Sequence, residues 1–346
     1  MKNEDRRYVS GKMTEGSMAK YKREEAQEWA WENLKGQWTM LMTPFDSEDN
    51  LDEQGLRGNI KHVRSLGTQG GGCTWGMGEF WSLEIEERMK VMELVADEAN
   101  GEWLTAAHVT HTSYKDMIKL AKYAEEVGID ILILAAPYFA TKTEQQVVEF
   151  TKILADHTNL AVMFYNSPQF GIVMSPDGLK EVCAPSNVVG VKEASFNQQL
   201  SIDTHILLGK KKIISTPDEW IYFKQEELGF QQRVMFANTS DWRFDTPEKN
   251  YYVQFVENAS KGIIDASFYE RHIKSVKEVS DKWWPRTVQK FGGVLPVTLC
   301  KYWSELMGMA AGNPRPPLGP FTEDEKRELE SDLIAIGHPI SERVSE

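Results

Sequence analysis

Cysteine is scarce in this chain. Only three cysteines occur among 346 residues, and they are widely separated at Cys73, Cys183 and Cys300. An odd number of cysteines without a Cys-x-x-Cys pair argues against a disulfide framework and against a cysteine-based zinc site. We therefore expect a protein of a reducing, intracellular compartment, the cytoplasm.

Excess positive charge and long apolar runs are also lacking. The chain has 39 Lys and Arg against 52 Asp and Glu, a formal net charge of −13, so its surface should repel nucleic acids and anionic membranes. The charged amino terminus has no apolar segment of the kind found in signal peptides, and no run of about 18 apolar residues occurs. The sequence predicts neither a nucleic-acid partner nor a membrane attachment.

The familiar cofactor and hydrolase motifs are missing as well. We find no P-loop, no His-Glu-x-x-His and no Gly-x-Ser-x-Gly. The stretch GGGCTWGMG at residues 70–78 is rich in glycine, but its glycines lack the spacing of a dinucleotide-binding fingerprint. A nucleotide cofactor is therefore not expected.

What the sequence does have is a regular alternation of apolar runs and segments with helical periodicity. The eight runs, which begin roughly 20 to 35 residues apart as in (β/α)₈ barrels, are residues 38–44, 71–76, 103–109, 130–137, 160–166, 188–194, 211–217 and 233–238. Clear helical periodicity lies between them, for example at residues 82–99, 113–128 and 143–157. This pattern predicts an α/β protein with a (β/α)₈ TIM barrel.

Further helices flank the expected barrel. We divide the chain into a polar amino-terminal tail and lead-in helix at residues 1–35, the barrel at residues 36–262, and a helical carboxy-terminal extension at residues 263–346. The extension has three segments of helical periodicity separated by Gly and Pro, at residues 263–284, 295–308 and 322–337.

One cation stands in a run that should be buried. Lys192 lies within VVGVKEASFN, at the end of the sixth apolar run, where an unpaired charge is costly. Either Lys192 is paired with a carboxylate such as Glu193 or Glu79, or its burial is functional, because a desolvated neutral amine is a nucleophile toward carbonyls. Tyr165 ends the preceding run, and active sites of barrels lie at these strand ends. The two side chains should therefore converge, as an amine and a proton-transferring phenol.

Four ordered motifs resemble one family. They are TPF at residues 43–45, GMGEFWSLEIEER at residues 76–88, FYNSP at residues 164–168 and GVKEAS at residues 190–195. Together they are similar to the dihydrodipicolinate synthase and N-acetylneuraminate lyase superfamily, over residues 36–338. The resemblance implies a TIM barrel in which Lys192 forms a Schiff base with pyruvate or another 2-oxo acid and Tyr165 transfers protons. It also implies no metal or organic cofactor, and a homotetramer built as a dimer of dimers.

The chain departs from the synthase pattern at its second substrate position. Gly76 and Met77 replace the usual pair of threonines, Phe139 replaces a tyrosine that the family donates across the dimer interface, and the arginine after the Tyr-Asn-x-Pro motif is missing. Backbone N–H groups of Gly76 and Met77 can still bind one carboxylate. The substrate-binding residues expected on this basis are Gly76, Met77, Thr43, Phe139, Asn166, Trp75 and Asn238.

The resulting hypothesis is a lyase for a substrate with an apolar part. We expect Trp75, Phe80, Trp81, Phe139 and Phe170 at the barrel mouth, where they favour an aromatic group or form a subunit interface. This resembles the hydratase-aldolase branch, which hydrates and cleaves aryl-substituted 2-oxo-3-enoates. Two alternatives stay open: a 2-oxo-3-deoxy sugar acid dehydratase or aldolase, and a keto-acid-binding protein without turnover.

Overall fold

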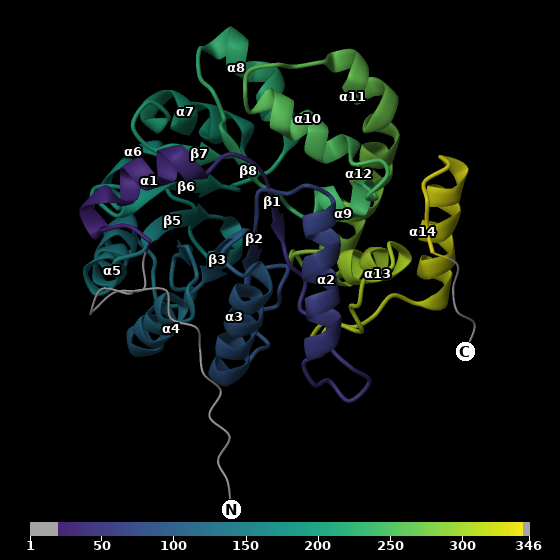
Figure 1. The fold of residues 1–346 in the computed structure, drawn as a ribbon, viewed down its shortest axis with the longest axis horizontal. Helices are drawn as coiled ribbons and strands as arrows, with labels where there is room; N and C mark the ends of the chain where they lie inside the picture. Colours follow the sequence, from purple (N-terminus) through teal and green to yellow (C-terminus); the bar gives the residue numbers. More distant parts are fainter. Residues whose placement is uncertain (1–19, 342–346) are drawn as a thin grey trace, which may run out of the picture.

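Eight parallel strands form the centre of the molecule. The computed structural model describes residues 20–341, and its sheet has the order β7-β6-β5-β4-β3-β2-β1-β8. The strands are β1 (Gly36–Met40), β2 (Gly70–Cys73), β3 (Leu104–His108), β4 (Ile131–Ala135), β5 (Ala161–Asn166), β6 (Val188–Glu193), β7 (Ile213–Ser215) and β8 (Val234–Phe236). The outermost strands β7 and β8 also lie in contact, so the sheet curls into a nearly closed barrel (Figure 1). Each of the eight expected runs overlaps one strand, which confirms the predicted fold.

Helices surround this barrel. They are α1 (Ala26–Asn33), α2 (Glu53–Ser65), α3 (Ile85–Ala99), α4 (Tyr114–Val127), α5 (Glu144–His157), α6 (Pro176–Val182), α7 (Gln198–Leu208), α8 (Tyr222–Leu228), α9 (Ser240–Phe244), α10 (Tyr251–Ala259), α11 (Ala266–His272), α12 (Lys274–Lys290), α13 (Val297–Leu306) and α14 (Glu323–Ala335). Within residues 20–341, none is both long and apolar enough to cross a membrane.

Local sequence signals start several of the barrel helices. The side chains of Asp52, Ser113, Thr143, Ser175 and Asn197 each accept a hydrogen bond from a backbone N–H in the first turn of the helix that follows. Such caps satisfy amide groups that have no partner inside the helix. Nearly every strand residue is buried, as expected for parallel strands covered by helices.

The lead-in helix closes one end of the barrel. Helix α1 packs against β5 and β6, and the Gln27 side chain donates to the carbonyl of Val189, near the start of β6 (3.3 Å). The strand ends that carry Lys192 and Tyr165 are at the opposite end. Residues 1–19 of the expected polar tail lie outside the described residues.

The carboxy-terminal extension differs in one detail from its expected three helices. The first is divided into α11 and α12 at Ile273, whose φ of −117° departs from helical geometry and whose side chain is buried in a second apolar core. Helix α12 then continues past Pro285. Helices α12 to α14 gather on the same side of the barrel as α10 and α11 (Figure 1).

Candidate active site

The Lys192 side chain is enclosed at the carboxyl end of β6. It is 0 % exposed, and its Nζ lies 3.4 Å from the side-chain oxygen of Asn238, which follows β8. The same nitrogen lies 4.8 Å from the ring centroid of Trp75 and 4.9 Å from that of Tyr165. One amide oxygen and two aromatic rings therefore surround the amine.

Neither carboxylate that could have paired with Lys192 does so. Glu193 points to its own loop, where it accepts hydrogen bonds from the Ser195 backbone and hydroxyl. Glu79 instead forms an ion pair with Lys301. Burial without a counter-charge lowers the pKa of the Lys192 amine from 10.5 to about 7, since desolvation disfavours the ammonium form. A large fraction of the amine is thus neutral near neutral pH.

Tyr165 lies beside Lys192 on the neighbouring strand. The two residues are register partners in the β5–β6 ladder, so both side chains leave the sheet on the same side. Burial raises the pKa of the Tyr165 phenol to about 12, although a hydrogen bond with Ser167 opposes the change. The phenol therefore keeps its proton at neutral pH and can donate it.

The loop after β2 provides an opening and two free N–H groups close to Lys192 and Tyr165. A Cβ on Gly76 would lie 3.9 Å from the Tyr165 hydroxyl and only 2.5 Å from a methyl group of Leu295, so the bare glycine leaves an opening toward Tyr165. The N–H groups of Gly76 and Met77 make no backbone hydrogen bond within residues 20–341. Two free donors beside a phenol suit a carboxylate.

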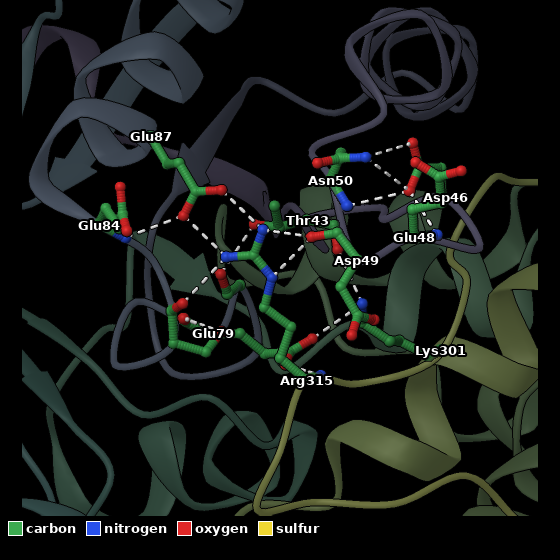
Figure 2. A network of polar contacts seen from close by, with 12 residues as sticks. Thr43, Asp46, Glu48, Asp49, Asn50, Glu79, Glu84, Glu87, Lys301 and Arg315 are labelled. Carbon is green, nitrogen blue, oxygen red and sulfur yellow. Dashed lines mark hydrogen bonds and ion pairs between the residues drawn. The ribbon is translucent and has the colours of Figure 1, made fainter.

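Ion pairs from the carboxy-terminal extension hold this loop (Figure 2). Glu79 has a left-handed φ of 54°, and its carboxylate pairs with Lys301 Nζ (2.8 Å) and accepts from the Arg315 backbone N–H (3.0 Å). The Arg315 guanidinium in turn makes a bidentate pair with Glu87 of α3 (2.6 and 2.7 Å). Glu79 thus ties the loop after β2 to the carboxy-terminal extension.

Two expected substrate-binding residues have polar atoms that bond to loop backbone, and a third is exposed. Thr43 donates to the Gly78 carbonyl (2.7 Å), and Asn166 exchanges two hydrogen bonds with the Met174 backbone, so both fix loop backbone. Phe139 is 90 % exposed with a φ of 72° and is not among the residues that line the apolar cavity beside Gly76. The structure therefore brings Lys192, Tyr165, Trp75, Gly76 and Asn238 together, with Met77 adjoining.

An apolar cavity of about 270 Å³ opens beside Gly76. Its lining is Gly76, Phe80, Trp81, Tyr138, Gln169, Phe170, Val294, Leu295, Pro317 and Leu318. The Phe170 ring lies 5.2 Å from that of Tyr165, which joins the cavity wall to the polar pair. Three of the expected aromatic residues, Phe80, Trp81 and Phe170, line this cavity, whereas Trp75 is buried and does not. Residues 294–295 and 317–318 of the extension also line it. The sequence did not predict this contribution, because no local motif marks it.

A buried histidine and arginine support the wall behind this cavity. The Arg88 side chain donates to the carbonyls of His108 (2.5 Å) and Thr110 (3.0 Å). His108 Nδ1 lies 3.0 Å from the Thr74 carbonyl, so it carries the ring proton. Burial, and next the Arg88 charge, hold the pKa of His108 well below its ordinary value. A neutral imidazole therefore packs edge-on against Phe80, at 4.5 Å between centroids.

Comparisons with known proteins identify the family and agree with the fold. Residues 33–336 match the model of the dihydrodipicolinate synthetase family. The 4-hydroxy-tetrahydrodipicolinate synthase of Bacillus subtilis is 28 % identical over 309 residues, covering 86 % of this chain and 98 % of that protein. A DapA-like lyase of Pyrobaculum islandicum is 27 % identical over 315 residues, with 88 % and 99 % covered.

Solved structures show the same fold. YagE, a prophage protein of E. coli K12, superimposes with a TM-score of 0.76 at 20 % identity, covering 88 % of this chain and 98 % of its own. The dihydrodipicolinate synthase of Aquifex aeolicus gives a TM-score of 0.73 at 22 % identity, with 89 % and 100 % covered. Because the family match spans the barrel and most of the extension, the chain belongs to the dihydrodipicolinate synthetase family and is an aldolase-type lyase.

Proposed function

We propose that Lys192 forms a Schiff base with a 2-oxo acid, and that the enzyme makes or breaks a carbon–carbon bond next to the resulting imine. The observation that carries the proposal is a buried amine without a counter-charge, beside a protonated phenol whose hydroxyl lies close to Gly76, a residue that lines the apolar cavity. An amine with a pKa of about 7 is available as a nucleophile at neutral pH. That YagE was crystallised with pyruvate supports the substrate class.

The chemistry uses only these groups and water. The neutral amine of Lys192 adds to the keto carbon, Tyr165 passes a proton to the carbinolamine oxygen, and water leaves to give a protonated imine. Imine formation leaves Tyr165 as a phenolate, and in cleavage the electron pair of the breaking carbon–carbon bond flows into the imine while this phenolate takes the proton of the substrate hydroxyl and the aldehyde departs. Tyr165 then returns the proton to the enamine carbon, and addition of water to the imine releases pyruvate and restores the neutral amine and the protonated phenol.

The second part of the substrate should be apolar. The two free N–H groups of the β2 loop provide for one carboxylate, next to the Tyr165 hydroxyl. Beyond Gly76, the cavity wall consists mainly of Phe80, Trp81, Phe170 and Leu295. Burying an aryl group there gains roughly 1.5–3 kcal/mol, whereas a second carboxylate without a cationic partner costs several. Aryl-substituted 2-oxo-3-enoates, hydrated and then cleaved to an aldehyde and pyruvate, fit these constraints.

A second, more polar cavity beside Asn238 favours another substrate class, the 2-oxo-3-deoxy sugar acids. It has a volume of about 160 Å³, adjoins Asn238 and includes the polar side chains of Glu193, Ser201, Thr216 and Asp218. Hydroxyl groups of a 2-oxo-3-deoxy sugar acid would find partners there. Because Asn238 contacts Lys192, this candidate shares the Schiff base with the first.

Trapping tests the covalent step. The protein is incubated with pyruvate and sodium borohydride, and its intact mass and peptide map are measured. We expect covalent addition at Lys192, and none in a Lys192→Ala variant. Lys180→Ala, at an exposed position of α6, is the matched control and should label as the wild type does. Labelling at another lysine, or no labelling, refutes the assignment.

Substrate comparison tests the specificity. Purified protein is assayed with an aryl-substituted 2-oxo-3-enoate, a 2-oxo-3-deoxy sugar acid, and pyruvate plus aspartate semialdehyde. We expect the highest kcat/KM for the aryl compound. A higher value for the sugar acid would favour the polar cavity beside Asn238, and a higher value for the semialdehyde would rule out the apolar specificity.

Assembly and location complete the proposal. The exposed Phe139 is a candidate contact between subunits of a homotetramer, and light scattering of the wild type and of Phe139→Ser would test it, with a smaller assembly expected for the variant. Three buried cysteines without disulfides are compatible with the reducing cytoplasm.

A further inference from the structure

Each of the three glycines of β2 lies against an indole ring. A Cβ on Gly70, Gly71 or Gly72 would come within 2.8, 2.0 and 2.2 Å of the rings of Trp38, Trp103 and Trp75, respectively. Successive residues of a strand face opposite sides, so the rings at residues 70 and 72 are on one side of the strand and the ring at residue 71 is on the other. The glycine-rich stretch therefore makes room for tryptophan side chains.

The rings on one side form an aromatic column that ends at Lys192. Trp38 contacts Phe236 at 5.0 Å between ring centroids, and Phe236 contacts Trp75 at 5.6 Å. The Trp75 ring then lies 4.8 Å from Lys192 Nζ. All three rings are 0 % exposed. Within this column, the ring next to the amine belongs to Trp75. The ring can occupy this position only because Gly72 has no side chain.

We propose that Trp75 is a positioning residue for the Schiff-base amine: held against Gly72 and Phe236, its ring fills the space beside Lys192, excludes water from the amine and keeps it next to Tyr165. The inference rests on the proposed role of Lys192. It assigns to this loop residue a function that is separate from direct substrate binding.

The other groups around the amine do not replace this effect. Tyr165 of β5 is protonated at neutral pH, and Asn238 is neutral. Ser215, the register partner of Lys192 on β7, accepts a hydrogen bond from the Phe236 N–H. His108 of β3 is neutral, and the charge of Lys192 helps to lower its pKa. Since none of these groups is an anion, burial decides the protonation of the amine.

Two effects of the indole ring oppose each other. The face of an indole attracts an ammonium ion, which by itself would favour protonation. The ring also displaces the water that an ammonium ion needs, which favours the neutral amine. Lys192 is fully enclosed and burial lowers its pKa, so we expect the loss of hydration to be the larger effect. Removing the ring should let water in and raise the pKa.

Competitive labelling with acetic anhydride tests this without turnover. The reagent modifies only neutral amines, so peptide mapping over a pH series gives the apparent pKa of Lys192 in each variant. Trp75→Ala should raise it by one unit or more from its value of about 7, which lowers both acetylation and pyruvate trapping at pH 7 by about fivefold or more. Raising the pH should restore both rates. Trp75→Phe, which keeps an aromatic ring, should give a smaller change in the same direction and serves if the alanine variant does not fold.

Trp103→Phe is the matched control. The Trp103 ring lies against Gly71 on the other side of β2. The apparent pKa of Lys192 in this variant should therefore equal that of the wild type. An unchanged pH dependence in both Trp75 variants overturns the inference, as does an equal change in Trp103→Phe. A wild type that is acetylated at Lys192 with a low pKa but is never trapped by pyruvate overturns the proposed function instead, while the effect of Trp75 on the amine would still be measured.

Discussion

Replacing Lys192 by methionine should stabilise the fold while abolishing the proposed chemistry. The side chain is fully buried, has no ion-pair partner within residues 20–341, and touches two aromatic rings. Methionine has a similar length, is apolar, and packs well against aromatic rings. The substitution therefore removes a desolvated amine without creating a large cavity.

The size of the effect follows from the pKa. The native state lowers the pKa of this amine from 10.5 to about 7, and each pKa unit corresponds to roughly 1.4 kcal/mol. The buried amine thus costs the native state about 4 kcal/mol of unfolding free energy at pH 7. The sign follows from proton binding: between pH 7 and 10.5 the unfolded chain binds the proton more tightly, so the cost is full below pH 7 and disappears as the pH rises through this range.

The assay is unfolding by urea, followed by tryptophan fluorescence at pH 7 and at pH 9.5 or above. Lys192→Met should be more stable than the wild type at pH 7, by an amount of the order of the estimated 4 kcal/mol, and the difference should shrink at the higher pH. Lys180→Met, at an exposed site, should change stability little at either pH. If Lys192→Met is less stable than the wild type at pH 7, the amine is not held neutral by burial, and the reasoning fails.

Three further substitutions test the surroundings of the amine. Tyr165→Phe should keep the fold and pyruvate binding but reduce kcat by roughly 10²–10⁴; a wild-type rate in steady-state assays would remove the phenol from proton transfer. Gly76→Val should lower kcat/KM for the aryl substrate by roughly 100-fold, because a Cβ there lies 2.5 Å from Leu295 and faces the Tyr165 hydroxyl; equal turnover would show that substrate does not pass Gly76. Lys301→Met leaves the buried Glu79 carboxylate without its cation and should cost about 3–5 kcal/mol in urea unfolding, with part of the loss recovered in the double variant with Glu79→Gln; a loss below about 1 kcal/mol would contradict a stabilising role for the pair.

The barrel could be predicted because its signals are local. Each apolar run overlaps a strand, and the polar residue that begins a helix stands next to it in sequence. The convergence of Lys192 and Tyr165 was also predictable, since parallel strands bring their carboxyl ends to one side. What could not be predicted was the break at Ile273, because it depends on how the extension packs against the second core.

The site was predicted less completely than the fold. Trp75 was expected to bind substrate at the mouth, but its ring is buried beside Gly72. Thr43 and Asn166 were expected to contact substrate, but their polar atoms bond to loop backbone. Phe139 is exposed in the single chain, and its part in a subunit contact stays a prediction. In each case the residue type suggested a role in binding, but the sequence did not reveal the direction of the side chain.

The sequence alone therefore determined the order of strands and helices, the family, and the pair of side chains at the ends of β5 and β6. These features depend on residues that are close together in the sequence, so periodicity and strand position can be recognised there. Only the tertiary structure decided what surrounds that pair. Residues with left-handed φ, such as Thr74 and Glu79, occur in the loop after β2, and an ion pair from Lys301 of α13 and a hydrogen bond from the Arg315 backbone N–H hold this loop. The direction of Trp75 depends on contact with Phe236, 161 positions away, and the cavity wall beside Gly76 depends on Leu295, 219 positions away; no local pattern records either contact.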